Sequence, residues 1–263
     1  MRRIIHISDL HFGRENKEIE QELLKDIHKH NPSVVVVSGD LTQRAKLGEF
    51  QAAKKFLAQI PFPKIIVPGN HDIPLYNLYG RFIKRLSRFR KHISKNIDKN
   101  FEDEEIAVFG INSARSFTFK KGRISMSQIK ELKESLAMVG EEKLKILVTH
   151  HPLPSLGRFG LALPVLEEGG MDVLLTGHIH ESSVGNLKTN LTLTNNKMLA
   201  ISAGTAISAR TRGEPNSYNL IEVKNQNLEL KLCAWSPEES SFHQAGFFEF
   251  HKNGDKWEQV KSE

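Results

Sequence analysis

The feature that most limits the fold of this chain is a series of short runs of branched apolar residues separated by segments of helical periodicity. That alternation is typical of buried parallel strands joined by helices. Six runs predict strands: RIIHIS (3–8), SVVVVS (33–38), KIIV (64–67), IAVFGI (106–111), LKILVT (144–149) and DVLLT (172–176). Segments 17–30 and 47–60, between the first three runs, repeat apolar residues at helical spacing. The chain is therefore predicted to begin as βαβαβ.

Two later regions complete the expected fold. Segment 125–138 predicts another helix, with Ser125 or Ser127 as its N-cap. After residue 182 the apolar runs are separated by Asn and Gly turns, which predicts strands returning antiparallel. These runs are SSVGNL (182–187), NLTLTN (190–195), MLAISAG (198–204), SYNLIEV (217–223), LELKLCAW (228–235) and QAGFFEF (244–250). We expect an α/β fold with a two-sheet β-sandwich core flanked by helices.

Length and composition favour a single globular domain over residues 1–263. Cys233 is the only cysteine, so an intramolecular disulfide is impossible, and a reducing cytoplasm fits this chain. The first apolar run is interrupted by His6 and Asp9, and is too short for a signal peptide or a membrane-spanning helix. We therefore expect a cytoplasmic protein. Its formal net charge of +6 favours anionic partners without naming one.

Polar side chains follow five of the predicted strands, at the point where each strand ends. They are Asp9 and His11, then Gly39 and Asp40, then Gly69, Asn70, His71 and Asp72, then His150 and His151, and finally Gly177, His178 and His180. Ligands of open α/β sheets bind beyond the carboxyl ends of the strands, so we expect these groups to converge. The glycines would allow sharp turns or a close backbone approach at these ends.

The converging side chains predict a metal site. The candidate ligands are Asp9, His11, Asp40, Asn70, His150, His178 and His180. Carboxylate, amide oxygen and imidazole without thiolate suit manganese, iron or zinc. These ligands exceed what one ion needs, whereas two divalent or trivalent ions that share a carboxylate would use them all. Asp40, central among the strands, is the best bridge.

The motifs D-x-H, G-D, G-N-H-D, H and G-H-x-H, in this order between residues 9 and 180, resemble those of the calcineurin-like metallophosphoesterases. Within that family the chain is most similar to bacterial class III cyclic nucleotide phosphodiesterases. The resemblance implies an αββα fold and a catalytic role for His71. It implies one metal on Asp9, His11, Asp40 and His180, and a second on Asp40, Asn70, His150 and His178. Residues after 182 match loosely, so no substrate is implied there.

The mechanism expected of such a site is attack on phosphorus by a hydroxide that bridges the two metals. His71 would protonate the leaving oxygen or stabilise the phosphoryl group, with Asp72 orienting it. The leading hypothesis is hydrolysis of a small phosphodiester or nucleotide, with a cyclic nucleotide as one candidate. The alternatives are a membrane-associated hydrolase of nucleotide-lipid pyrophosphates of the UDP-diacylglucosamine type, a nuclease, and a non-catalytic scaffold. A nuclease is disfavoured because the positive charge is concentrated in one segment.

That segment, 80–96, carries seven cationic residues and no acid: Arg81, Lys84, Arg85, Arg88, Arg90, Lys91 and Lys95. Apolar residues fall on one face of the helix expected within 76–96: Leu78, Phe82, Leu86, Phe89 and Ile93. We expect this face to pack on the core. The alternative is contact with an anionic membrane. Arg158, Arg210 and Arg212 lie in loop-like stretches that suit phosphate binding.

Overall fold

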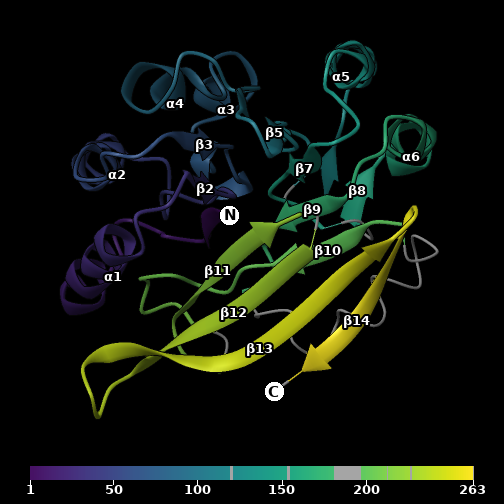
Figure 1. Cartoon of the computed structure of the whole chain (residues 1–263). Coiled ribbons are helices and arrows are strands. Elements are labelled where there is room, and N and C mark those ends of the chain that lie inside the picture. The colour runs from purple at the N-terminus through teal and green to yellow at the C-terminus, as the bar shows by residue number, and fades with distance from the viewer. Residues whose placement is uncertain (119–120, 153–154, 181–196, 212, 226, 263) are drawn as a thin grey trace.

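The computed structural model describes residues 1–118, 121–152, 155–180, 197–211, 213–225 and 227–262. Two large β-sheets form its centre, and helices cover their outer sides (Figure 1). This arrangement confirms the predicted α/β fold with a two-sheet core flanked by helices. The positions of the strand ends in the two sheets decide where the polar residues lie.

The first sheet has the strand order β14-β13-β12-β11-β1-β2-β3. Its strands are β1 (Arg2–Ile7), β2 (Val34–Val37), β3 (Lys64–Ile66), β11 (Ser217–Lys224), β12 (Asn227–Ser236), β13 (Ser241–Asn253) and β14 (Lys256–Ser262). β1, β2 and β3 run parallel, joined through α1 (Lys17–His30) and α2 (Leu47–Ala58), which confirms the predicted βαβαβ start. Strands β11 to β14 pair antiparallel, as β11 does with β1.

The second sheet has the strand order β10-β9-β7-β5-β4. Its strands are β4 (Asn100–Glu102), β5 (Ile106–Gly110), β7 (Leu144–Val148), β9 (Val173–Thr176) and β10 (Leu199–Ser202). A small ribbon of β6 (Gly122–Arg123) and β8 (Leu156–Gly157) lies apart from it. The helices of this half are α5 (Met126–Ala137) and α6 (Phe159–Glu168). The Ser125 side chain accepts a hydrogen bond from Gln128 N, which confirms that residue as the N-cap of α5.

The layers follow from side chains that alternate between the two faces of each strand. In β2, Val34 and Val36 belong to an apolar cluster shared by both sheets. Val35 and Val37 belong to the cluster beneath α1 and α2. A third apolar cluster joins the second sheet to α5 and α6, and it includes Leu147 of β7. The parallel strands β2, β5, β7 and β9 are buried on both faces, and this is why they read as continuous apolar runs.

Some predictions about the later part of the chain were wrong or incomplete. β10 pairs parallel to β9, not antiparallel as predicted for that run. All four residues of β10 are buried, and a strand buried on both faces is typical of a parallel sheet. Helix α6 and strand β14 were not predicted from the sequence. The predicted runs 182–187 and 190–195 lie outside the described residues.

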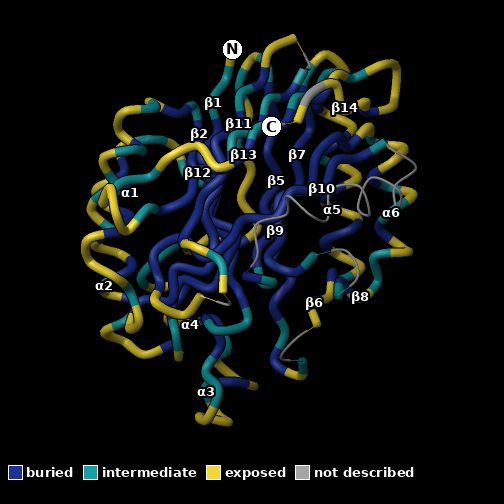
Figure 2. Tube along the Cα trace, turned by 90° about the horizontal axis from the view of Figure 1, so that it is seen from below, coloured by how far each residue is buried: buried dark blue, intermediate teal, exposed yellow. Residues whose placement is uncertain are grey.

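The predicted basic helix within 76–96 is two short helices, α3 (Leu78–Phe82) and α4 (Ser87–His92). Near the end of α3, the Arg81 carbonyl accepts a 2.6 Å hydrogen bond from Ser116 Oγ, as the last carbonyls of a helix often do from a side chain. Leu86 and Phe89 are buried in the core as expected, but Phe82 is 44% exposed and Leu78 is 68% exposed, so the predicted packing of these two residues is wrong. Figure 2 shows α3 at one extremity of the molecule, away from the buried strands.

Candidate metal centre

The carboxyl ends of five strands bring the predicted site residues together at one edge of the two sheets. Asp9 and His11 follow β1, and Asp40 follows β2. After β3, a single 3₁₀ turn, η1 (Asn70–Asp72), carries three of the predicted residues. The remaining histidines follow strands of the second sheet: His150 follows β7, and His178 and His180 follow β9. The site is thus built where the two sheets meet.

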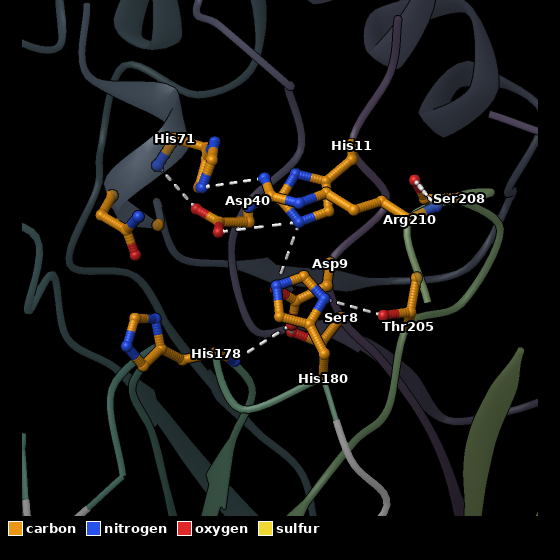
Figure 3. A network of polar contacts seen from close by, with 12 residues as sticks. Ser8, Asp9, His11, Asp40, His71, His178, His180, Thr205, Ser208 and Arg210 are labelled. Atoms are coloured by element: carbon orange, nitrogen blue, oxygen red, sulfur yellow. Dashed lines mark hydrogen bonds and ion pairs between the residues drawn. The ribbon is translucent and has the colours of Figure 1, made fainter. Parts of the chain in front are cut away.

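One group of candidate ligands forms around Asp9. Asp9 Oδ1 lies 3.5 Å from His11 Nε2 and 3.5 Å from His180 Nε2. The two imidazole rings are stacked with centroids 5.1 Å apart. Figure 3 shows these side chains directed toward one another. Asp9, His11 and His180 together have the spacing of a metal-binding group.

A second group forms around His150, and Asp40 lies between the two groups. His150 Nε2 is 3.4 Å from Asp40 Oδ2 and 3.2 Å from Asn70 Oδ1. The same Asp40 Oδ2 lies 3.9 Å from His11 Nε2, in the first group. Asp9, Asp40 and His150 also satisfy the spacing of a metal-binding group. One carboxylate oxygen therefore faces both groups, as a bridging ligand would.

Hydrogen bonds to neighbouring groups determine which side-chain atom of Asp9, Asp40 and His150 remains available to bind a metal. Asp9 Oδ2 accepts hydrogen bonds from Ser8 Oγ at 2.7 Å and His178 N at 3.0 Å, so Oδ1 faces the centre. Asp40 Oδ1 accepts from His71 N at 2.8 Å, so Oδ2 faces the centre. His150 Nδ1 lies 2.7 Å from the Ser38 carbonyl, which makes Nδ1 the donor and leaves Nε2 available as a ligand.

The inward-facing atoms lack hydrogen-bond partners. Among the described residues, Asp9 Oδ1, Asp40 Oδ2 and His11 Nε2 are buried and make no hydrogen bond. A buried polar atom without a partner costs about 1–3 kcal/mol. Carboxylate and imidazole acceptors that face one another are satisfied together by a cation, so the donor set fits the metal ions that the sequence predicts.

The backbone at the candidate ligands is unusual. Among the described residues, ten non-glycine residues have positive φ, and five of them are candidate ligands. These are Asp9 (52°), His11 (45°), Asp40 (52°), His178 (76°) and His180 (61°). Left-handed backbone costs an L-residue roughly 1–2 kcal/mol. The loops thus hold strained conformations that aim these side chains into one space.

Glycines beside the site act through close approach as well as conformation. Gly39 has a φ of 102°, which favours glycine. Gly69 has extended backbone, but an added Cβ would lie 2.0 Å from Asp40 Oδ1 and 2.4 Å from Asp40 N. At Gly177 it would lie 1.8 Å from Ser8 Oγ. These two glycines let neighbouring strand ends approach closely enough to share the site.

We expect Gly69→Ala to lower the free energy of unfolding by about 1–3 kcal/mol, because the new methyl group displaces the Asp40 backbone. It should also reduce metal binding, since Asp40 lies between both ligand groups. Gly48→Ala is the matched control, because an added Cβ there meets nothing within 4 Å on the exposed side of α2. Urea denaturation of both variants checks this. Equal stability of the two would contradict the close approach.

Burial and neighbouring charges shift the pKa values of the site residues in opposite directions. Burial favours the neutral carboxyl of Asp9, but nearby His11 and His150 hold its pKa below the ordinary value. Burial likewise disfavours a charged His150, but Asp40 and Asp9 outweigh it and raise its pKa to about 9. Burial lowers the pKa of His178 to about 4. A cation bound among these groups would replace the proton of His150, so protons compete with metal.

Of the predicted catalytic pair, Asp72 makes other contacts than the predicted one with the His71 ring. The Nδ1 atom of His71 lies 2.9 Å from the Gln43 carbonyl, which fixes the ring with Nε2 directed at the cleft. Within the described part of the chain, the Asp72 carboxylate instead accepts hydrogen bonds from Gly69 N, Leu41 N, Thr42 N and Thr42 Oγ1. The predicted orienting contact from Asp72 to the His71 ring is therefore replaced by one from Gln43, and Asp72 joins the two loops.

His151, which was expected at the strand end but not among the candidate ligands, also lies in the site. It is fully buried, its Nδ1 lies 2.8 Å from Ser113 Oγ, and its Nε2 has no hydrogen-bond partner among the described residues. With His150 and His178 it has the spacing of a metal-binding group. The only signal in the sequence is its adjacency to His150, and both side chains of an i, i+1 pair rarely face one site.

A cleft of about 770 Å³ opens over the centre and includes His71, His178 and His180 in its lining. Arg210 lines this cleft, as the sequence allowed, together with Arg14 and Arg44, which the sequence analysis did not single out. Of the other arginines proposed for phosphate, Arg158 lies at the N-cap of α6, and Arg212 is outside the described residues. The cleft therefore combines candidate ligands with a cationic wall.

A two-sheet core with Asp, Asn and His side chains at its strand ends defines the class of metallophosphoesterases. The chain belongs to the calcineurin-like phosphoesterase family, because residues 2–182 match the model of that family. The resemblance inferred from the five motifs is thereby confirmed. The matched region contains all seven candidate ligands.

Curated relatives are similar over parts of their length. The chain is 25% identical over 187 residues to the protein YpbG of Bacillus subtilis, covering 69% of this chain and 62% of that protein. It is 24% identical over 162 residues to the glycerophosphodiester phosphodiesterase GpdQ of Enterobacter lignolyticus, covering 57% of each. It is 28% identical over 204 residues to the 3',5'-cyclic adenosine monophosphate phosphodiesterase CpdA of Escherichia coli, covering 68% of this chain and 70% of that protein.

Solved structures share the fold at low identity. A dimetal phosphatase from Danio rerio aligns with a TM-score of 0.63 and 13% identity, over 88% of this chain and 95% of that one. A purple acid phosphatase from yellow lupin also aligns with a TM-score of 0.63 and 13% identity, over 92% of this chain and 52% of that one. These similarities support the two-sheet fold.

Proposed function

We propose that this protein is a dinuclear-metal-dependent phosphodiesterase that hydrolyses a small phosphodiester or nucleotide. The observation that carries the proposal is the position of Asp40, whose unpartnered Oδ2 lies 3.4 Å from His150 and 3.9 Å from His11. Buried acceptors on both sides of one carboxylate are what two neighbouring cations require. The phosphodiesterase names of GpdQ and CpdA support the reaction type.

Each residue has a role in this proposal. Asp9, His11, Asp40 and His180 would hold one ion, and Asp40, Asn70, His150 and His178 the other. The ions, when bound, would supply Lewis acidity toward the phosphoryl oxygens and an activated water as nucleophile. His71, held by Gln43 and open to the cleft, would donate a proton to the leaving oxygen or stabilise the phosphoryl group. Asp72 would maintain the loop that carries His71.

Metal removal and restoration test the proposal. Protein treated with chelator should lose phosphodiesterase activity and regain it with manganese, iron or zinc, which ranks the metals as well. A panel of cyclic nucleotides, nucleotide-linked pyrophosphates and short DNA would identify the substrate class. Protein that binds two metal equivalents but hydrolyses none of these would support the scaffold alternative. Salt-sensitive cleavage of DNA alone would support the nuclease.

Membrane association is a second candidate, which one surface favours. Beside the cleft lies an aromatic patch of exposed side chains: Tyr76, Leu78, Tyr79, Phe82, Ile83 and Phe117. The rings of Phe82 and Phe117 lie 5.1 Å apart, so loop and helix form one surface. Exposed cations such as Lys84 border it, and residues 73–97 contain no acid. Within the described residues, no helix has the length and apolar character to cross a bilayer.

We expect Phe82→Ser/Ile83→Ser to weaken binding to vesicles that contain anionic phospholipid, because these two residues contribute exposed apolar area to the patch. Met138→Ser/Leu161→Ser removes two exposed apolar residues elsewhere, at the C-cap of α5 and on α6, and is the matched control. Vesicle flotation at low and high salt measures the effect. Failure of the unmodified protein to float would exclude the membrane-associated hydrolase. The predicted cytoplasmic location remains a prediction.

A further inference from the structure

The wall of the cleft next to His71 carries three arginines that the proposed mechanism does not use. Arg14, Arg44 and Arg210 line the same cleft as Asp40 and His71. Arg210 Nη1 lies 3.3 Å from His71 Nε2, so this guanidinium borders the position proposed for the leaving oxygen (Figure 3). The cationic wall therefore begins directly beside the proposed reaction site.

Two of these arginines are held by loops that bind each other. The Arg14 carbonyl accepts hydrogen bonds from Ala209 N at 2.9 Å and from Ser208 Oγ at 3.3 Å. Ser208 Oγ also accepts one from Arg210 N at 3.1 Å, and Asn16 N donates to the Ile207 carbonyl at 2.8 Å. The loops after β1 and β10 thus keep Arg14 and Arg210 on one side of the cleft. This placement comes from backbone contacts, not from chance positions of long side chains.

Among the described residues, no carboxylate neutralises the charge of these arginines. In the part of the chain that the structure describes, none of the three guanidinium groups forms a salt bridge with a carboxylate. The acids nearest Arg14 and Arg44 along the sequence are occupied: Glu15 accepts from Gly13 N and pairs with Lys17, and Glu49 accepts from Arg44 N and Lys46 N. Arg44 Nη1 donates to the neutral Tyr76 hydroxyl at 2.8 Å. Within the described part of the chain, the wall therefore has uncompensated positive charge.

A simple phosphodiester carries a single negative charge, and that charge belongs at the candidate metal centre. A substrate with only that one charge would leave the three arginines without an anionic group to bind. We propose that Arg14, Arg44 and Arg210 bind a second phosphate group of the substrate, so that the preferred substrate is a phosphodiester or pyrophosphate with at least two phosphate groups. The planar guanidinium matches phosphate oxygens through paired hydrogen bonds. This inference rests on the proposed function for the reaction, but the binding of phosphate by the arginines can be measured separately.

The first test measures binding without turnover. In chelator, the unmodified protein should bind adenosine 5'-diphosphate about tenfold more tightly than adenosine 5'-monophosphate by calorimetry, and the difference should shrink with salt. Arg14→Gln/Arg210→Gln should remove that difference. Arg90→Gln, an exposed arginine on α4, is the control and should keep it. No preference in the unmodified protein, or equal preference in the double variant, would overturn the inference.

The second test uses a matched pair of substrates with metal restored. The dinucleotide ApA has one phosphodiester, and pApA adds a 5'-phosphate; diadenosine pyrophosphate places the second phosphate next to the first. The unmodified protein should favour at least one of the two-phosphate substrates by about tenfold in kcat/KM, and the double variant should lose that ratio. A ratio unchanged in the variant would refute the role of the arginines. Absence of hydrolysis of all three would count against the proposed function, while the calorimetry still decides the binding.

Discussion

Asp40→Ala is expected to release most of the bound metal and to lower kcat/KM about a thousandfold, more than any other single ligand change. Its Oδ2 faces His11 on one side and His150 on the other, and its Oδ1 holds the backbone N–H of His71. The substitution therefore removes a ligand shared by both groups and loosens the turn that carries His71. No other candidate ligand makes all three contacts.

Elemental analysis of the purified variant measures the loss of metal, and thermal unfolding shows whether the fold survives. Asp40→Asn is the informative companion, because its amide oxygen can still accept from His71 N but carries no charge. We expect it to retain the turn and to bind metal weakly. Metal content near that of the unmodified protein in Asp40→Ala would disprove the bridging role.

His71→Ala is expected to keep its metal and to lose turnover by about a hundredfold or more on substrates with poor leaving groups. The ring lies outside the groups of candidate ligands, and its edge is 4.8 Å from the His11 ring. Burial lowers the pKa of His71, an effect that the charge of Asp40 opposes. A protonated ring therefore depends on the nearby negative charge.

Two diesters distinguish the roles of His71. If the ring protonates the leaving oxygen, an alkyl diester should lose much more rate than an aryl diester whose leaving group needs no proton. Equal losses would point to electrostatic stabilisation of the phosphoryl group. Arg90→Gln again serves as an unrelated surface control. Loss of metal from His71→Ala would contradict its place outside the ligand sets.

The sequence predicted the βαβαβ start and the convergence of the polar residues because both depend on local pattern. Apolar runs show where the parallel strands lie, and the polar residues follow directly after them in sequence. The direction of β10 could not be predicted in this way, because a short buried run has no periodicity that separates parallel from antiparallel pairing. The division of residues 76–96 into two helices was not predicted either, and the carbonyl of Arg81 near the end of α3 is bound by Ser116, which is distant in sequence.

The site residues were predicted best where their spacing along the sequence places both side chains on the same side of the chain. The pairs Asp9-x-His11 and His178-x-His180 could be recognised from the sequence alone. His151 and Arg14 could not, because their place depends on Ser113 and on the loop around Ser208. Asp72 shows the opposite case: its position in the motif suggested a contact with His71, but three backbone N–H groups compete successfully for its carboxylate. Long-range hydrogen bonds decided these outcomes.

The left-handed backbone at Asp9, His11, Asp40, His178 and His180 means that folding and ligand presentation make opposite demands at these positions. Glycine would relieve the strain at each position, although its greater freedom in the unfolded chain would offset about 0.4–1 kcal/mol of the gain. Glycine and asparagine adopt this conformation at the lowest cost, but neither carries a carboxylate or an imidazole. The loops therefore give up some folding free energy to present these ligand atoms.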